Sequence, residues 1–435
     1  MYEPVLFLNL QEGRPATIDE YRQSGGYQSL EKVVRRELSR QDLIRMVTDS
    51  GLRGRGGAAF PTGRKWSFIQ DHYPYPRYVV ANTDEMEPGT FKDRKLVNVD
   101  PHLVIEGIIL AGYAVGASKA FFFIRPSYEL DAELMERESE VARQAGFLGK
   151  NILGSDFSLE LVVHRSAGRY ICGEATATVQ AIMGNRAHPQ KTLHMAEHGL
   201  WGQPTLVNNA ETLACVPPIV RRGPRWFKGL ARTETGAGTR LYCVSGKVNR
   251  PGCYELPSGT PLREIIEEAA GGLLPGSELK AVIPGGASTS FLPPKFLDVA
   301  MDTDSLKAIG HRLGTGAVIV FDQNSCIVAA TLNITEYFAR ESCGFCTPCR
   351  EGLPYIRDLL WRIENGEGRE EFIPLIREMA AFMDQAYCGF APGAAQPVKG
   401  MLAYFEDEIR EHLRRKKCPF KEKYHPHREL WYPAE

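Results

Sequence analysis

The chain has 435 residues, of which 43% are hydrophobic and 24% are charged, and its formal net charge is −1. These values exclude an intrinsically disordered protein and give no indication of a basic nucleic-acid-binding surface. The first residues, 1–6, lack the basic segment and the apolar core of a signal peptide. Most cysteines are isolated, as is typical of reduced thiols, so we expect a cytoplasmic protein.

Helix and strand patterns alternate through the first half of the chain. Apolar residues at helical spacing over 29–49, interrupted near 39–42, predict two helices. The alternation predicts an α/β layered domain over residues 1–236. The apolar stretch 103–124 contains two charged residues and is expected to be a buried helix followed by a strand, not a membrane span. The expected strands are 77–81, 120–124 and 159–164, and the expected helices are 103–115 and 130–145.

A change of composition at residues 234–238 marks a second unit. Strands at 241–248 and 253–256, a helix opened by Pro261, and strands at 281–284 and 317–321 predict a small β-grasp-like domain over residues 237–325. From Ile327 onward the pattern is helical, with about four helices, and predicts a helical domain over residues 326–435.

Four cysteines have the spacing of an iron–sulfur site. Cys343, Cys346 and Cys349 are separated by two residues each, and Cys388 follows far downstream. This arrangement is typical of the four ligands of one [4Fe–4S] cluster, with Cys388 assigned by elimination among single cysteines. A structural zinc site usually combines two cysteine pairs or adds histidines, and no second pair is present. Zinc and unliganded cysteines remain the alternatives.

A glycine-rich segment, 51–66, contains Arg55 and Lys65. Glycines let a backbone approach a phosphate or a flavin edge, and the two cations add positive charge. The segment is a poor Rossmann fingerprint, because a predicted helix precedes it and Ala59 occupies the last glycine position. A flexible loop is the alternative.

Polar residues gather in three further segments. Asn82, Asp84, Glu85 and Glu87 follow a predicted strand, where carboxylates suit ribose hydroxyls or flavin polar edges, although a solvated turn would have the same composition. The segments 169–174 and 207–212 contain polar groups that could bind a heterocycle. The asparagine pair of the second segment could equally cap a helix that begins near residue 210.

Together these segments resemble the NADH-binding flavoprotein component, the F subunit, of bacterial respiratory complex I (NADH-quinone oxidoreductase), which has relatives in NAD-linked hydrogenases and formate dehydrogenases. The resemblance extends from Gly51 to about Val398, with the motifs in the same order. The most specific motifs are Gly54-Arg-Gly-Gly, Phe60-Pro-Thr-Gly-Arg-Lys-Trp, Asp84-Glu-Met-Glu-Pro-Gly-Thr-Phe-Lys-Asp-Arg94, Tyr170-Ile-Cys-Gly-Glu and Glu341-Ser-Cys-Gly-Phe-Cys-Thr-Pro-Cys-Arg350.

The resemblance implies a Rossmann-like FMN/NAD domain, a ubiquitin-like β-grasp (SLBB) domain and a C-terminal four-helix bundle that holds a [4Fe–4S] cluster. FMN would be the second cofactor and NADH the substrate. The residues that would bind FMN are Gly54, Arg55, Gly56, Lys65, Asn82, Asp84, Glu85, Gly173, Glu174, Asn208, Asn209 and Thr212; those that would meet NADH are Phe60, Phe68, Glu87, Tyr170 and Lys191.

The implied activity is NADH dehydrogenase. Hydride would pass from NADH directly to FMN, so no catalytic side chain is expected, and electrons would leave singly through the cluster. The implied partners are a small [2Fe–2S] thioredoxin-like subunit and a large iron–sulfur subunit of the peripheral arm, at the cytoplasmic side of the inner membrane. Contact with the membrane would be made only by partner subunits, and no nucleic acid is expected.

Three residues depart from the family pattern around the implied pocket. Ala175 replaces the second of two adjacent carboxylates, His194 replaces an aromatic residue expected to stack on adenine, and Ala59 replaces a glycine. Losing an aromatic stack costs about 0.5–1.5 kcal/mol. These departures support an alternative function, that of an electron-transfer or docking subunit of a related complex with a weakened or altered dinucleotide site.

Overall fold

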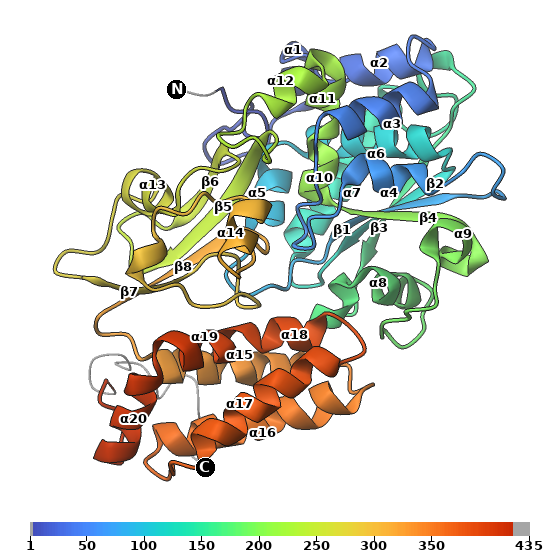
Figure 1. The fold of residues 1–435 in the computed structure, drawn as a ribbon. Helices are drawn as coiled ribbons and strands as arrows, with labels where there is room; N and C mark the ends of the chain where they lie inside the picture. The colour runs from blue at the N-terminus through green and yellow to red at the C-terminus, as the bar shows by residue number, and fades with distance from the viewer. Residues whose placement is uncertain (1–2, 421–435) are drawn as a thin grey trace.

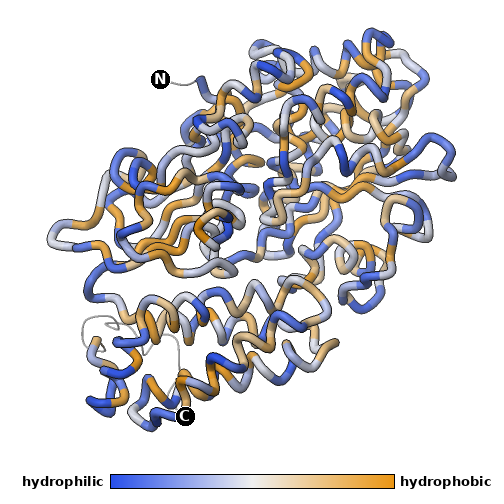
Figure 2. The backbone as a smooth tube through the Cα atoms, viewed as in Figure 1, coloured by the Kyte–Doolittle hydropathy of each residue, from blue (hydrophilic) through white to orange (hydrophobic). Residues whose placement is uncertain are grey.

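The computed structural model describes residues 3–420, and residues 421–435 of the predicted helical region lie outside this range. The chain forms two sheet-containing parts side by side, and the C-terminal helices lie along one side of both (Figure 1). Hydrophobic residues are concentrated in the strands and in the helix segments that face them (Figure 2). This arrangement confirms the predicted α/β fold class with a following helical region.

The first sheet is entirely parallel, in the order β3-β2-β1-β4. Chain order runs outward from β1 to β3, whereas β4 lies on the other side of β1. A parallel sheet binds ligands outside the carboxyl ends of its strands where the strand order reverses, which here is between β1 and β4. The strands are β1 (Tyr78–Thr83), β2 (Lys119–Ile124), β3 (Glu160–Arg165) and β4 (Thr205–Asn209).

Helix α6 (Pro101–Val115) is the centre of the first part. Every residue in it except Tyr113 is buried, as expected of the apolar stretch. Glu106 in this helix accepts hydrogen bonds from the backbone N–H groups of Tyr27 (2.9 Å) and Leu30 (3.0 Å) and from the Tyr21 hydroxyl. A buried carboxylate is tolerated when it is hydrogen-bonded in this way, and Glu106 therefore ties the N-terminal helices to the core.

The helices around α6 match the expected periodicity. The predicted interruption near residues 39–42 is the start of α3, where the Ser39 side chain caps the helix and Asp42 completes a capping box. Within the described residues no single helix is long and apolar enough to cross a membrane, although α5 and α6, bent by 103°, pass that test together. Besides α6, the helices of the first part are α1 (Ile18–Gln23), α2 (Gln28–Val34), α3 (Arg40–Asp49), α4 (Thr62–Ser67), α5 (Lys92–Val99), α7 (Glu129–Gln144), α8 (Ala175–Ile182), α9 (Met195–His198), α10 (Ala210–Ala214), α11 (Val216–Arg222) and α12 (Pro224–Lys228).

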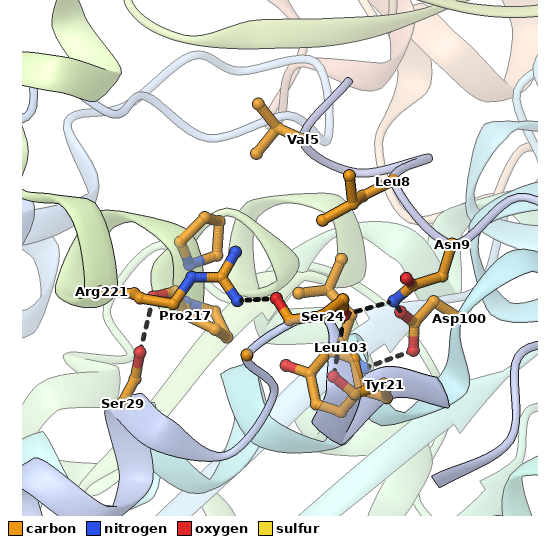
Figure 3. A pocket seen from close by; sticks show the side chains of 12 residues that line it. Val5, Leu8, Asn9, Tyr21, Ser24, Ser29, Asp100, Leu103, Pro217 and Arg221 are labelled. Atoms are coloured by element: carbon orange, nitrogen blue, oxygen red, sulfur yellow. Dashed lines mark hydrogen bonds between the residues drawn. The ribbon is translucent and has the colours of Figure 1, made fainter. Parts of the chain in front are cut away.

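The N-terminal segment is held by polar contacts rather than by a ligand-sized pocket. Asn9 donates to Asp100 (2.7 Å) and Ser24 (3.0 Å), and Arg221 donates to the Ser24 carbonyl (2.7 Å; Figure 3). The cavity among these residues has a volume of about 10 Å³, which is barely enough for one water molecule. Its groups therefore contribute to stability.

The second sheet is mixed, in the order β6-β5-β8-β7, with β5 and β8 parallel and both outer pairs antiparallel. The predicted helix after Pro261 is the short helix α13 (Leu262–Glu264) followed by a π-helical turn, 265–269. The other elements are β5 (Thr239–Gly246), β6 (Gly252–Pro257), β7 (Leu279–Ile283), α14 (Thr303–Ala308) and β8 (Ala317–Asp322). All four predicted strands of this part are present.

The C-terminal region has six α-helices within the described residues, two more than expected. The additional breaks fall after Cys388, at Ala395 between α18 and α19 and at Phe405 between α19 and α20, so Cys388 precedes three short helices and not one. The cysteine run lies between the first two helices, as predicted. The helices are α15 (Ile327–Glu341), α16 (Thr347–Glu364), α17 (Phe372–Phe382), α18 (Phe390–Ala394), α19 (Gln396–Tyr404) and α20 (Glu406–Arg415).

Residues 51–61 of the glycine-rich segment form a loop between α3 and α4, and residues 62–66 belong to α4, so the segment is not the strand-to-helix turn of a Rossmann fingerprint. The Gly54 N–H donates to the Phe60 carbonyl (2.9 Å), which closes the loop on itself. Ala59 has a φ of 53°, in the left-handed region, whereas the neighbouring Ala58 does not. A left-handed non-glycine residue costs about 1–2 kcal/mol.

We therefore predict that Ala59→Gly raises the free energy of unfolding by about 0.5–1 kcal/mol, because relief of the strain exceeds the entropy added to the unfolded chain. The matched change Ala58→Gly should lower it by about 0.5–1 kcal/mol, since no strain is relieved there. Denaturant unfolding of both variants beside the parent chain measures the difference. Equal destabilisation by the two variants would contradict a strained Ala59.

Candidate functional site

A cavity of about 420 Å³ lies at the carboxyl ends of β1 and β4, where the strand order reverses. Thr315 from the second part of the chain and Gly389 and Phe390 from the C-terminal helices also contribute to its wall, so all three parts meet there. The predicted residues that line it are Gly54, Gly56, Phe60, Lys65, Asn82, Asp84, Glu85, Glu87, Tyr170, Gly173, Glu174, Asn208, Asn209 and Thr212.

The glycine-rich loop borders the cavity with its backbone. A Cβ atom added at Gly56 would lie 3.2 Å from the Asn209 Cβ, so a side chain there would crowd the wall. Lys65 donates to the Val207 carbonyl (2.5 Å), and burial lowers its pKa to about 8. Arg55 does not line the cavity: its N–H donates to Thr212 (2.8 Å), and its guanidinium donates to backbone carbonyls at 237 and 239.

The asparagines at the strand ends make hydrogen bonds within the protein and also line the cavity. Asn209 caps α10 by accepting from the Glu211 N–H (3.1 Å), so the helix-capping alternative is correct for this residue. Asn208 accepts from the Trp66 indole N–H (2.9 Å), and Asn82 donates to the Gly173 carbonyl (3.1 Å). These contacts hold the asparagines in single orientations, and all three line the cavity.

Two buried carboxyl groups follow β1. Burial raises the pKa of Asp84 to about 6. One Asp84 oxygen accepts from Ser166 (2.7 Å), and the other, Oδ2, has no hydrogen-bond partner among the described residues. Burial, and then the nearby Asp93, raise the pKa of Glu85 to about 7. A carboxyl group with such a pKa is partly protonated at neutral pH and can donate a hydrogen bond as well as accept one.

Lys92 was not among the expected site residues, although it lies in the motif that begins at Asp84. Its side chain is buried at the cavity wall, 2.6 Å from Asp93, 3.0 Å from Glu211 and 3.2 Å from the Asn209 side-chain oxygen. Burial by itself lowers the pKa of Lys92, but the two carboxylates raise it overall. Lysines are normally exposed, so only the fold reveals this ion cluster.

Glu87 connects two parts of the chain across the cavity. One of its oxygens accepts from the Tyr170 hydroxyl (2.5 Å) and the other from the Ser288 N–H (2.5 Å). Tyr170 in turn packs edge-on against Phe338 and Phe390 of the C-terminal helices. Glu87 and Tyr170 therefore form a rigid corner of the cavity.

An aromatic pair lies at the edge of the cavity. Phe60 lines it, and Phe68, whose ring centre is 6.0 Å away, does not; both rings are exposed and Arg64 lies near both. Lys191 also lies outside the lining, over the ring of Tyr387 at 5.0 Å. Exposed aromatic faces beside a cation suit a flat, negatively charged ligand.

Of the three residues that depart from the family pattern, two line the cavity and one does not. Ala175 and Ala59 line the cavity, and a carboxylate is therefore missing from its wall at position 175. His194 is exposed at the start of α9 and is not part of the lining. Its substitution therefore does not alter the cavity itself.

The four predicted cluster cysteines converge. Burial raises the pKa of Cys349 to about 12, and the other three thiols act on it in the same direction, so all four lie close to one another. Cys346 and Cys349 lie at the start of α16, and Cys388 precedes α18, so helix N-termini direct positive dipole ends toward the site. Three cysteines separated by two residues each, with a fourth from a later segment, fit a [4Fe–4S] cluster.

The cavity fits FMN by three observations. Glycine backbone borders it, with a Cβ fitting only tightly at Gly56, the buried Asp84 Oδ2 needs a donor that the described protein does not supply, and the cations Lys65 and Lys92 lie in its wall. Its volume is within the usual range of about 300–1,000 Å³ for cofactor pockets. Because Gly389, next to Cys388, belongs to the same wall, the flavin and cluster positions adjoin.

Family models match each part of the chain. The Nuo51 FMN-binding domain matches residues 47–218, the SLBB domain matches residues 241–292, and the iron–sulfur binding region of NADH-ubiquinone oxidoreductase-F matches residues 329–412. These matches agree with the parallel-sheet part, the mixed-sheet part and the helical part of the structure.

Curated relatives match along nearly the whole chain. The NADH-quinone oxidoreductase F 2 subunit of Rhizobium meliloti is 44% identical over 97% of this chain and 100% of its own length. The corresponding F subunit of Escherichia coli is 42% identical over 93% and 92%. A chain of an NAD+-reducing [NiFe]-hydrogenase in the air-oxidized state superimposes with a TM-score of 0.79 at 32% identity, covering 93% of this chain and 67% of that one. The cavity, the cysteine site and these likenesses together place the chain in the family of NADH-quinone oxidoreductase F subunits.

Proposed function

We propose that this chain oxidises NADH with bound FMN and passes electrons singly through a [4Fe–4S] cluster to partner iron–sulfur subunits of a complex-I-type NADH-quinone oxidoreductase. The observation that carries the proposal is the shared wall: residues that follow Cys388 border the same cavity as the carboxyl ends of β1 and β4. FMN, when bound, accepts two electrons as hydride and releases them one at a time. The protein therefore has to place the reactants, and no side chain has to act as an acid or base.

The assigned binding roles follow from position. The glycine-rich loop, with Gly54 and Gly56, would hold the phosphate and ring of FMN through backbone contacts, together with Lys65. Arg55 would act by positioning this loop, because its side chain is bonded elsewhere. Asp84 would accept a hydroxyl through its unpartnered oxygen. The remaining polar contacts to FMN would come from Asn82, Glu85, Gly173, Glu174, Asn208, Asn209 and Thr212.

NADH would enter beside the exposed aromatic pair. Phe60 and Phe68 would stack on a base, while Glu87 and Tyr170, locked together, would orient the nicotinamide half. Lys191, which is exposed beside Tyr387, would meet a phosphate. The pKa of about 7 leaves Glu85 partly protonated at neutral pH, which lowers the negative charge of the wall and favours entry of an anionic dinucleotide.

The absent carboxylate at Ala175 favours the alternative function, an electron-transfer or docking subunit with an altered dinucleotide site. The intact corner formed by Glu87 and Tyr170, and the aromatic pair, support NADH oxidation instead. A smaller negative charge at the wall also weakens repulsion of NADH. We therefore infer that Ala175 tunes the site.

We further propose that the partners are a small [2Fe–2S] thioredoxin-like subunit and a large iron–sulfur subunit, at the cytoplasmic side of a membrane that only other subunits contact. Electrons must leave close to the cluster, and Phe345 between its ligands is 50% exposed. Tyr355 and Trp361 on α16 are also exposed. Apolar surface of this kind suits a subunit interface.

As domains we propose residues 1–236, 237–325 and 326–435.

Anaerobic titration with NADH tests the function. In the purified chain loaded with FMN and cluster, about one NADH per flavin should bleach the absorbance near 450 nm and produce the EPR signal of the reduced cluster. Dithionite reduction of the same sample is the control for intact centres. Reduction of both centres by dithionite but not by NADH would reject the proposal in favour of the electron-transfer subunit.

Substitution of Phe68 tests the entry site. Phe68→Ala should raise the KM for NADH about 3- to 10-fold, the equivalent of about 0.5–1.5 kcal/mol of stacking, and leave kcat nearly unchanged. The matched control is Phe382→Ala on α17, a similarly exposed phenylalanine outside the cavity. Steady-state reduction of ferricyanide by NADH measures both constants. An unchanged KM would remove Phe68 from the NADH site.

A further inference from the structure

A second group of metal-ligating side chains lies in the helical region, apart from the cluster cysteines. Cys326, Glu364, His412 and Cys418 are all buried, and one ligand atom from each lies within 4.8 Å of the others. Cys326 precedes α15, Glu364 ends α16, His412 is on α20 and Cys418 follows it (Figure 1). The two cysteines, a histidine and a carboxylate come from four segments, and none of these four residues lines the cavity.

The separations match a tetrahedral ion. The Cys326 sulfur is 3.3 Å from the His412 Nε2 and 3.7 Å from a Glu364 oxygen, and that Nε2 is 3.2 Å from the same oxygen. Zinc bonds of about 2.3 Å to sulfur and about 2.0–2.1 Å to nitrogen or oxygen put tetrahedral ligand atoms about 3.3–3.8 Å apart. These three ligand atoms therefore already stand near the corners that one ion would require, and the Cys418 sulfur lies within 4.8 Å of each of them.

Neighbouring groups orient the ligands as they do in metal sites. The other ring nitrogen of His412, Nδ1, lies 2.7 Å from the Glu408 carbonyl, to which it can donate, leaving Nε2 to bind a metal. The Cys326 sulfur accepts from the Ala329 N–H (3.2 Å), a contact that stabilises a thiolate. The Glu408 carboxylate accepts from the Ile327 N–H (2.6 Å) and so fixes the chain next to Cys326.

We propose that these four residues bind one structural zinc ion that fastens α20 to the ends of α15 and α16. Two sulfur ligands with one nitrogen and one oxygen in tetrahedral array favour zinc over magnesium, calcium or manganese. All four positions would be filled by buried protein groups, which is the arrangement of a structural site rather than a catalytic one. Zinc binding changes no oxidation state, and the ligands lose only protons.

The site is separate from the iron–sulfur centre but acts on the same helices. Cys326 caps one end of α15 and Cys343 follows the other end, about 22 Å away for a helix of this length. Fastening the first turn of α15 and the last turn of α16 would hold the two helices that carry the cluster ligands. Zinc would thus stabilise the frame of the cluster without taking part in electron transfer.

Metal analysis of the purified chain, loaded with flavin and cluster, tests the proposal. We expect about one zinc per chain beside about four iron atoms. Zinc-edge X-ray absorption of the same sample should show two sulfur neighbours at about 2.3 Å and two nitrogen or oxygen neighbours at about 2.0–2.1 Å. This measurement needs no variant, so it decides the question even if removal of a ligand prevents folding.

A matched pair of variants identifies the ligands. Cys418→Ala should lose at least about 90% of the zinc and unfold at a temperature several degrees lower, while it retains iron and flavin. The control Cys253→Ala removes a thiol from β6, outside the helical region, and should retain zinc. Two results would overturn the proposal: a chain that takes up no zinc when offered an equimolar zinc salt, with both thiols open to alkylation, or a disulfide between Cys326 and Cys418 detected by mass.

Discussion

Buried carboxylates that cross from one part of the chain to another are the constraint on which the site depends. Glu87 joins the first part to Ser288 of the second, and Glu211 accepts from the Leu241 N–H (3.1 Å) while it pairs with Lys92. Glu341 of the helical part accepts from the Tyr170 N–H (3.0 Å). An unpaired buried carboxylate is costly, so each of these groups holds its partners in place, and the cavity exists because they are satisfied together.

In this arrangement, different parts of the fold carry the binding residues and the electron-transfer cysteines. The parallel sheet supplies the polar strand ends, the mixed sheet closes one side, and the helices bring the cysteines to the remaining wall. Many of the lining residues lie in loops, but the buried network beneath them restricts their movement. Cofactors perform the redox chemistry in proteins of this kind, so a rigid frame that sets their separation is the main contribution of the chain. The proposed zinc ion belongs to this frame.

Local patterns were sufficient for many elements. The capping box at Ser39, the period-two strands and the cysteine spacing depend on neighbours within a few residues, and the structure has each of them. Strand β4 was not predicted, because its five residues end in two asparagines and resemble a turn. The number of C-terminal helices was underestimated, since helix breaks without a sharp sequence signal depend on packing.

The sequence by itself determined the fold class, the order of the three parts and the spacing of the four cysteines that converge, because each of these is encoded by short-range spacing or by contiguous motifs. Most of the cavity lining followed from the resemblance of those motifs to the family. Only the tertiary structure decided that the Arg55 guanidinium turns away from the cavity and that Lys92 is buried beside it. The same is true of the buried cluster formed by Cys326, Glu364, His412 and Cys418. These features depend on contacts between residues far apart in the chain, and no local pattern specifies which distant groups will meet when the core closes.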